Sequence, residues 1–229
     1  MSNKILFKST PQALAEDTYF KITDYDAGWM CVDFAIQGDR YCLPISLFMG
    51  YSMFYLLGVL YCMHPQCPLG CLERELYLND YLDKDEVGQL EVYHGDRARF
   101  NWDGEGRKII WSMQKARNEN RAQSQLSVNL QHFQNDQLIA DKTYEIGYRA
   151  LTEAVVRCLD AFIREYGLVA IGRDAFSGDF FRVRRFIFLK AYVLGRLNEV
   201  LLREDPTKMS VAKKSDFAAE MSILTAPLP

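Results

Sequence analysis

A long stretch without charge constrains this chain more than any other feature of its sequence. Residues 41–72 contain no Asp, Glu, Lys or Arg. Within that stretch, residues 43–63 are apolar enough to be a candidate for a membrane-spanning helix. Pro44, interspersed glycines and tyrosines that are spread along the segment favour a helix buried inside the protein instead. We expect that helix over about 47–63, with Ser46 as its N-cap, while a membrane-associated protein using residues 43–63 is the alternative.

Strand patterns come before the charge-free stretch. Over residues 18–47 the side chains alternate in character, and one alternate set is uniformly apolar: Met30, Val32, Phe34 and Ile36. That set is expected to face a core. Residues 37–40 have the composition of a hairpin turn, and Pro44 predicts that the pairing of the return strand ends there.

Further strands are predicted after the charge-free stretch. Residues 72–112 have the pattern of several short strands, and Asp103-Gly104 predicts a hairpin turn because Asp-Gly suits positive φ at both turn positions. The polar segment 114–125 is expected to be an exposed loop. Residues 126–131 alternate between apolar and polar side chains, which predicts another half-buried strand.

The hydrophobic period becomes that of a helix in the C-terminal part of the chain. Apolar residues recur at helical spacing from Tyr144 to Tyr166, and Gly167 follows where a C-terminal cap glycine belongs. The pattern predicts a helix over 141–166. A second helix is expected over about 181–203, ending near Pro206.

Strands followed by long helices indicate an α+β fold. We expect an antiparallel sheet packed on one face by a buried apolar helix and two long C-terminal helices. The sequence has neither an internal repeat nor a linker rich in Pro, Ser or Gly, so residues 1–206 are expected to form a single domain. Residues 207–229 are expected to be a C-terminal tail that is weakly docked or disordered, in which Phe217, Met221 and Leu224 form one docked turn at most.

The composition limits the functional classes. The 229 residues are 49% hydrophobic and 25% charged, which excludes a disordered or low-complexity protein. A net charge of -3 provides no overall basic surface for indiscriminate binding to nucleic acid. Residues 1–15 lack the apolar core of a signal peptide, so we expect a cytoplasmic protein whose cysteines are reduced.

The charges are distributed unevenly along the chain. Residues 73–105 carry four basic and ten acidic side chains, a local balance of -6. Such a segment is either a solvated acidic face or a docking surface for a basic protein partner, whose approach it would accelerate. On the second interpretation, the candidate partner-binding residues are the seven carboxylates Glu73, Glu75, Asp80, Asp83, Asp85, Glu86 and Glu91.

One short segment has the composition of a metal site. Cys62, His64, Cys67 and Cys71 place three thiols and one imidazole within ten residues. Structural zinc sites instead pair two short knuckles that are a dozen or more residues apart, and the sequence has no second knuckle. We therefore expect reduced, mostly buried cysteines and neither a metal nor another cofactor.

Basic and aromatic side chains alternate near the second predicted helix, where Phe180, Phe181, Phe186 and Phe188 lie among Arg182, Arg184, Arg185, Lys190 and Arg196. Such interleaving can bind single-stranded nucleic acid. The acidic balance of the chain favours a structural helix with its arginines on the outer face. We therefore expect no nucleic-acid partner.

No catalytic constellation is recognisable in the sequence. Cys158 falls on the core face of the predicted helix, and His94 and His132 are expected at the surface. Phosphate-binding glycine motifs are absent from the sequence. We expect no catalytic residue and no enzyme activity, with an enzyme of unknown class as the alternative.

The expected elements follow a recognisable order. A strand pair that holds Trp29 and Asp33 comes first, followed by an apolar helix opened by Ser46 and an acidic strand with Glu91. The hairpin Trp102-Asp103-Gly104-Glu105-Gly106, a strand near Leu126, a helix ending Tyr166-Gly167 and the pair Phe180-Phe181 come after them. In this order and texture, residues 18–202 resemble the small bacterial immunity proteins that are encoded beside polymorphic or contact-dependent toxins. The resemblance implies a non-enzymatic protein that binds one toxin domain and blocks it. The acidic segment 73–91 would then suit a basic toxin such as a nuclease.

Overall fold

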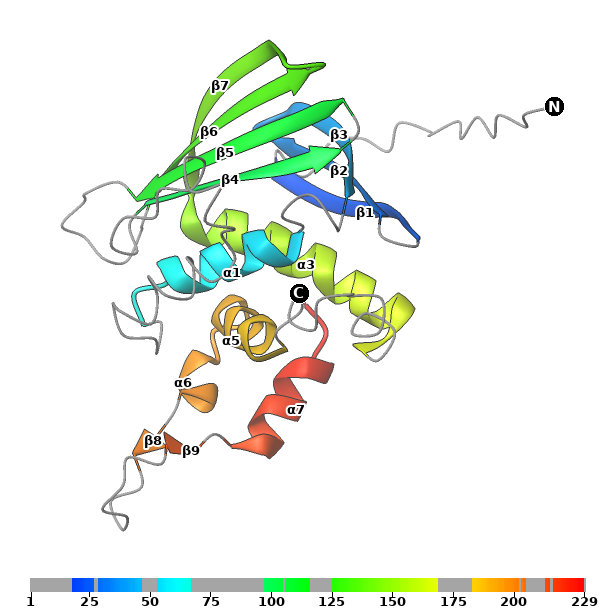
Figure 1. Ribbon diagram of the computed structural model, residues 1–229. Coiled ribbons are helices and arrows are strands. Elements are labelled where there is room, and N and C mark those ends of the chain that lie inside the picture. The colour runs from blue at the N-terminus through cyan, green and yellow to red at the C-terminus, as the bar shows by residue number, and fades with distance from the viewer. Residues whose placement is uncertain are drawn as a thin grey trace.

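The computed structural model describes residues 18–26, 29–46, 53–66, 97–104, 106–115, 125–168, 183–201, 203–204, 213–214 and 216–228. Two antiparallel sheets form its upper part (Figure 1). The first sheet has three strands in chain order, β1 Thr18–Asp26, β2 Trp29–Ile36 and β3 Asp39–Ser46. The second sheet has four strands in chain order, β4 Arg97–Gly104, β5 Arg107–Lys115, β6 Gln125–Gln134 and β7 Gln137–Gly147.

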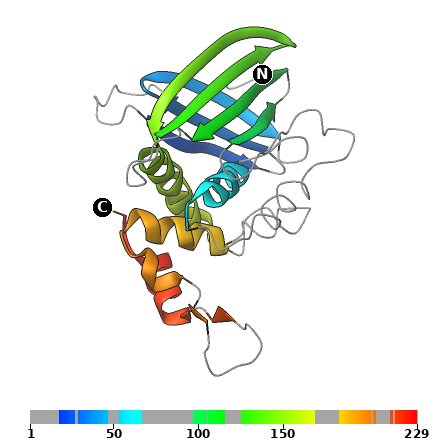
Figure 2. The ribbon, with the colours of Figure 1, turned by 90° about the vertical axis from the view of Figure 1, so that its left-hand side faces the viewer.

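The helices lie below the sheets in successive layers (Figure 2). They are α1 Met53–Met63, α3 Tyr148–Tyr166, α5 Val183–Val193, α6 Leu197–Val200 and α7 Phe217–Thr225. Helices α1 and α3 lie directly beneath the two large sheets, α5 lies under these helices, and α6 and α7 lie on the far side of α5. A small two-stranded sheet, β8 Arg203–Glu204 and β9 Lys213–Lys214, precedes α7. The predicted α+β class is confirmed, with the strands divided between two sheets.

The two sheets pack against each other through their aromatic inner faces. Phe34 of β2 contacts Trp102 of β4 edge-to-face, with ring centroids 5.4 Å apart, and Trp111 of β5 lies 4.8 Å from Trp102. All three rings are fully buried. The alternation predicted for β2 is confirmed, because its apolar set faces this core. Burial of such large rings is the main apolar contribution to stability in this layer.

Two hairpin turns have the backbone geometry that their strands require. The turn residues Gln37 and Gly38 have φ of 50° and 86°, and Asn135 and Asp136 have φ of 49° and 62°. Positive φ at both positions of a two-residue loop matches the right-handed twist of the flanking strands. The first turn was predicted from the sequence, whereas the second, together with strand β7, was not.

The predicted end of pairing at Pro44 is wrong. Strand β3 continues to Ser46, and Pro44 pairs with Cys31 of β2. A proline is tolerated here because β3 is an edge strand of its sheet, so the missing N–H removes no bond of the ladder. The carbonyl of Pro44 points away from β2 and lies against Gly104 of β4.

Gly104 therefore allows the backbones of β3 and β4 to pack closely. The turn lies two residues later than Asp103-Gly104 predicts. Asp103 and Gly104 both belong to β4 and pair with Lys108 and Arg107. The positive φ in this hairpin, 70°, belongs to Gly106. Any side chain at position 104 would meet the backbone of Pro44.

The helix predicted over 141–166 begins seven residues later than expected. Residues 137–147 form strand β7, and α3 begins at Tyr148. Tyr144 and Tyr148 are four residues apart, a spacing that fits a helix but is also even and therefore fits one face of a strand. The predicted end at Tyr166 and the cap at Gly167 are confirmed, since the Gly167 N–H donates to the Ile163 carbonyl at 2.8 Å with φ of 77°.

The second predicted helix is interrupted. Helix α5 ends at Val193, and Gly195 takes φ of 71°. The Arg196 N–H donates to the Ala191 carbonyl at 2.8 Å and the Gly195 N–H donates to the Tyr192 carbonyl at 3.1 Å. This hydrogen-bond pattern terminates a helix at a left-handed glycine, so the short helix α6 is a separate element.

The charge-free stretch supplies the buried helix α1. Leu56 is fully buried and Val59 is 2% exposed, which confirms that this protein's own elements cover them. The Tyr148 hydroxyl of α3 donates to the Leu60 carbonyl of α1 at 2.6 Å and ties the two helices together. No helix in the described ranges is long and apolar enough to cross a membrane. Residues 47–52 lie outside these ranges, so the N-cap role of Ser46, the last residue of β3, stays a prediction.

Part of the expected tail forms α7. Ile223 is fully buried and Leu224 packs partly against the core, whereas Phe217 is 73% and Met221 is 40% exposed. The docked face of the helix is therefore not the one that Phe217 and Met221 predict, because these two residues lie one turn apart on the exposed side.

The contact between Gly104 and Pro44 gives a direct test of the fold. Gly104→Ala should lower the free energy of unfolding in urea by roughly 1–3 kcal/mol, because the methyl group meets a backbone carbonyl that cannot rotate away. Gly147→Ala is the matched control. Its φ is -61° and its nearest neighbour is 4.0 Å away, so the cost should stay below about 1 kcal/mol. Equal stability of the two variants would contradict this packing.

Candidate functional site

The seven carboxylates predicted to bind a partner lie outside the described residues, as do Cys67, Cys71, His94 and Arg182. Their role stays a prediction. The segment 67–96 that holds the carboxylates links Gln66, just after α1, to Arg97 at the start of β4. Both anchoring elements pack into the common core, so the ends of this segment are fixed by the fold.

The described half of the metal-like segment is part of the core. Cys62 is buried and His64 is 3% exposed. The His64 ring packs edge-on against Tyr192 and Phe188, with ring centroids 4.7 and 5.1 Å away, and its Nδ1 accepts the Gln66 N–H at 3.1 Å. Burial, reinforced by the charge of Lys115, lowers the pKa of His64 to about 4. Within the residues that the structure describes, no group of three or more His, Cys, Asp or Glu side chains is placed to hold a metal ion.

Cys158 occupies the position predicted for it on the core face of α3. Its side chain is 6% exposed, and burial raises the pKa of its thiol to about 12, despite a backbone hydrogen bond with Ile22 of β1 that lowers it. A thiol with this pKa carries almost no thiolate at neutral pH and is a poor nucleophile.

His132 is half-buried and not fully at the surface as predicted. This residue ends the inner row of β6, and its ring lies 6.1 Å from that of Tyr41 across the gap between the sheets. Burial, together with the nearby charge of Arg107, lowers the pKa of His132. Its Nε2 atom is buried and has no hydrogen-bond partner among the described groups. The inward side of His132 follows from the strand period, because it continues the row of Leu126, Val128 and Leu130.

Beside His132, a chain of hydrogen bonds joins the two sheets. The Tyr144 hydroxyl of β7 donates to Asp39 of β3 at 3.0 Å, and Lys142 donates to the same carboxylate at 2.6 Å. The hydroxyls of Tyr41 and Tyr144 are 2.5 Å apart. Since the Tyr144 hydroxyl donates its hydrogen bond to Asp39, the Tyr41 hydroxyl is the donor in the contact between the two tyrosines. We name Asp39, Tyr41, Lys142 and Tyr144 the inter-sheet cluster.

The hydrogen bonds within the inter-sheet cluster shift the pKa values of Asp39 and Tyr144. The hydrogen bond from Lys142 lowers the pKa of Asp39, and that from Tyr144 adds to the effect. Burial raises the pKa of Tyr144, and its hydrogen bonds with Tyr41 and Asp39 raise it further. The arrangement therefore favours an ionised Asp39 and neutral tyrosines, which suits a fixed bridge between the sheets. Sequence analysis missed the cluster because strand β7 was assigned to a helix.

The basic residues of α5 are not all on an outer face, contrary to the sequence prediction. Lys190 is fully buried and Arg185 is 5% exposed, while Arg184 is exposed. The aromatic residues between them, Phe186 and Phe188, belong to the core. A buried lysine needs a partner for its charge, and that partner comes from α3.

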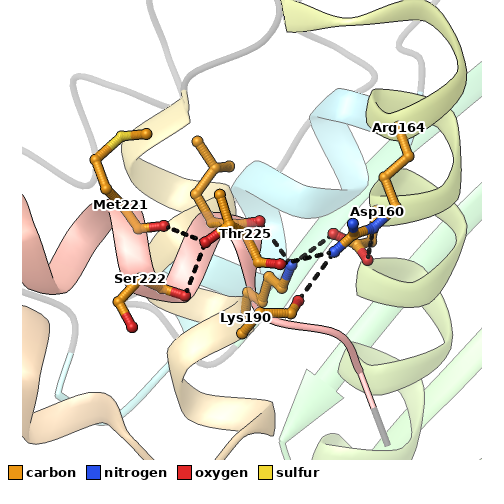
Figure 3. Close-up of polar contacts among 8 residues, drawn as sticks. Asp160, Arg164, Lys190, Met221, Ser222 and Thr225 are labelled. Carbon is orange, nitrogen blue, oxygen red and sulfur yellow. Dashed lines mark hydrogen bonds and ion pairs between the residues drawn. The ribbon is translucent and has the colours of Figure 1, made fainter.

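Asp160 of α3 holds Lys190 and Arg164 together (Figure 3). Lys190 Nζ lies 2.6 Å from Asp160 Oδ1, and Arg164 Nε lies 2.9 Å from Asp160 Oδ2. Both cations also donate to carbonyls at the end of α7: Lys190 to Leu224 at 2.9 Å, and Arg164 to Thr225 at 3.2 Å and Ala226 at 3.0 Å. We call Asp160, Arg164 and Lys190 the charged triad. These carbonyls lack partners within their own helix, and cations are favoured at that end of a helix.

Comparison with known proteins adds no relative. The chain matches no protein-family model, no curated protein and no solved structure.

The lowered pKa of His64 predicts a loss of stability in acid. The unfolded chain binds a proton at about pH 6.5, but the folded protein does so only at about pH 4. The contribution of neutral His64 to the free energy of unfolding is therefore fully present above pH 6.5. It declines as the pH falls towards 4, by at most about 1.4 kcal/mol per pH unit. Urea titrations at pH 7 and pH 5 measure how far the free energy of unfolding of His64→Asn lies below that of the wild type. This difference should be smaller at pH 5 than at pH 7. The same loss at both pH values would show that His64 is not buried in its neutral form.

The cysteines should differ sharply in reactivity. Cys42 is exposed, whereas Cys62 and Cys158 are buried. With iodoacetamide at pH 8, peptide mass spectrometry should detect modification of Cys42 first, and Cys158 should react at least about 100-fold more slowly because its thiolate is suppressed. In denaturant the difference should disappear. Rapid labelling of Cys158 in the native protein would contradict its place in the core.

Proposed function

We propose that this chain is a non-enzymatic binding protein of the immunity type, which acts in the cytoplasm and neutralises a basic toxin domain through residues 73–91. The observation that carries the proposal is the concentration of carboxylates in that segment, seven within 19 positions. Opposite charge on a partner raises the rate of encounter and fixes the orientation of the complex.

The setting of the segment supports a binding role. A 30-residue connection, 67–96, links a buried helix to an edge strand of the second sheet. A packed scaffold that holds both ends of a binding segment limits the entropy lost on binding. The scaffold here is well packed, with α1 buried along its described length.

The roles of the buried titratable groups also support the proposal. The charged triad holds helices together, the inter-sheet cluster joins two sheets, and His64 and Cys158 fill the core in neutral form. Each of these groups has a structural partner or a structural place. A catalytic site instead tends to keep perturbed groups facing a cleft.

Charge reversal tests the proposal. The toxin domain encoded by the gene next to that of this chain should bind wild-type protein in a one-to-one complex, measured by isothermal titration calorimetry, without turnover of the toxin or the inhibitor. The triple variant Glu73→Lys, Glu75→Lys and Asp80→Lys should weaken binding by at least about 100-fold, because attraction becomes like-charge repulsion. The association rate of the wild type should fall as salt is added.

A matched triple variant controls for net charge. Asp24→Lys, Glu165→Lys and Glu220→Lys change the charge by the same amount at exposed or partly exposed positions on β1, α3 and α7. This control should keep the wild-type affinity within about threefold. Unchanged affinity of the first triple variant, or equal weakening by both, would refute the acidic docking surface. Absence of any complex would refute the immunity-type function.

A further inference from the structure

We infer that α7 is a releasable strap, which the charged triad locks onto α3 and α5 and which can open while the rest of the protein stays folded. The inference concerns the described part of the chain and does not depend on the proposed function.

The first observation is how little apolar contact holds α7. Ile223 is the one residue of this helix that is fully buried and Leu224 packs partly against the core, whereas Phe217 is 73% and Met221 is 40% exposed. By contrast, α3 buries residues along its whole length, from Tyr148 to Phe162. Elements with few buried apolar contacts open at low free energy, before global unfolding. Figures 1 and 2 place α7 at the end of the molecule away from the two large sheets, where it contacts α5 and α6.

The second observation concerns the polar contacts between α7 and the other helices. Arg196 donates to the Ser222 hydroxyl at 3.1 Å, and the charged triad makes further contacts. The Lys190 and Arg164 side chains donate to three successive carbonyls, those of Leu224, Thr225 and Ala226 (Figure 3). All three lie at the C-terminal end of the helix, where carbonyls carry partial negative charge. The charged triad therefore holds the C-terminal end of α7, and the exposed Phe217 lies at the N-terminal end.

The third observation concerns the energetics of opening. With α7 in place, Lys190 has no exposed side-chain surface, and Asp160 is 10% exposed. Such burial forfeits hydration of both charges and cancels much of the gain from pairing them. When α7 leaves, Lys190 loses the Leu224 carbonyl but keeps Asp160, and water can reach both groups. Opening therefore strands no unpaired charge in the interior, which would otherwise make it prohibitive.

Native-state hydrogen exchange followed by mass spectrometry tests the strap. Amides in residues 218–226 should exchange at least about 100-fold faster than those in residues 152–162 of α3, under conditions where exchange reports the opening equilibrium. Equal rates in the two peptides would show that α7 opens only on global unfolding, and this would overturn the inference.

A pair of carboxylate variants on α3 tests the lock itself. Asp160→Asn removes the charge that holds both cations, whereas Glu153→Gln makes the same change at a residue that pairs only with Arg157, also four positions on, and does not contact α7. Asp160→Asn should speed exchange in α7 by at least about tenfold, because an uncompensated Lys190 destabilises the closed state. Exchange in α3 is expected to rise by a similar factor, because global unfolding starts from the same closed state. Glu153→Gln should change neither peptide.

One result would overturn the role of the triad, namely unchanged α7 exchange in Asp160→Asn. If Asp160→Asn does not fold, Ile223→Ala gives an independent reading. It removes the buried anchor of α7 without touching a charge and should accelerate exchange in α7 by at least about tenfold. Gly104→Ala, which weakens the packing between the two sheets, should accelerate exchange in α3 and leave α7 unchanged, and equal acceleration of the two peptides would refute a separate strap.

Discussion

The aromatic contact between the two sheets is the interaction on which the remaining structure depends. Trp102 and Trp111 on one sheet and Phe34 on the other fill the space between them without solvent exposure. Seven strands supply this layer, and neither sheet could bury its inner face alone. Helices α1 and α3 then cover the lower end, where Tyr25 of β1 packs on Phe162. The positions of α5 and α7 follow from the surface that α3 presents.

Much of the fold could be predicted from local sequence pattern. The charge-free segment correctly predicts a helix buried on most sides, the alternation in β2 correctly predicts its core face, and Gly167 correctly predicts the end of α3. These features are local, because period, hydropathy and cap chemistry act within a few residues. The division of the strands into two sheets depends on contacts between distant residues, and no local pattern specifies it.

The errors have identifiable physical causes. Tyr144 and Tyr148 satisfy both the helical and the strand period, so β7 was merged with α3. Pro44 ends a strand only if its missing N–H belongs to a ladder, and the sequence does not reveal that β3 is an edge. A lysine such as Lys190 is expected at the surface, and its burial becomes predictable only when Asp160, thirty positions away, is known to face it. Of the predicted site, the carboxylates of 73–91 remain a prediction, since they lie outside the described residues.

The boundary between β3 and β4 has a mechanical consequence. The two strands belong to different sheets, and the Pro44 carbonyl lies against Gly104 where β3 approaches β4. In the described ranges no backbone ladder joins the two sheets at this boundary. Stress applied across the sheets will concentrate there, because separating them costs side-chain packing and the hydrogen bonds of the inter-sheet cluster but breaks no strand pairing.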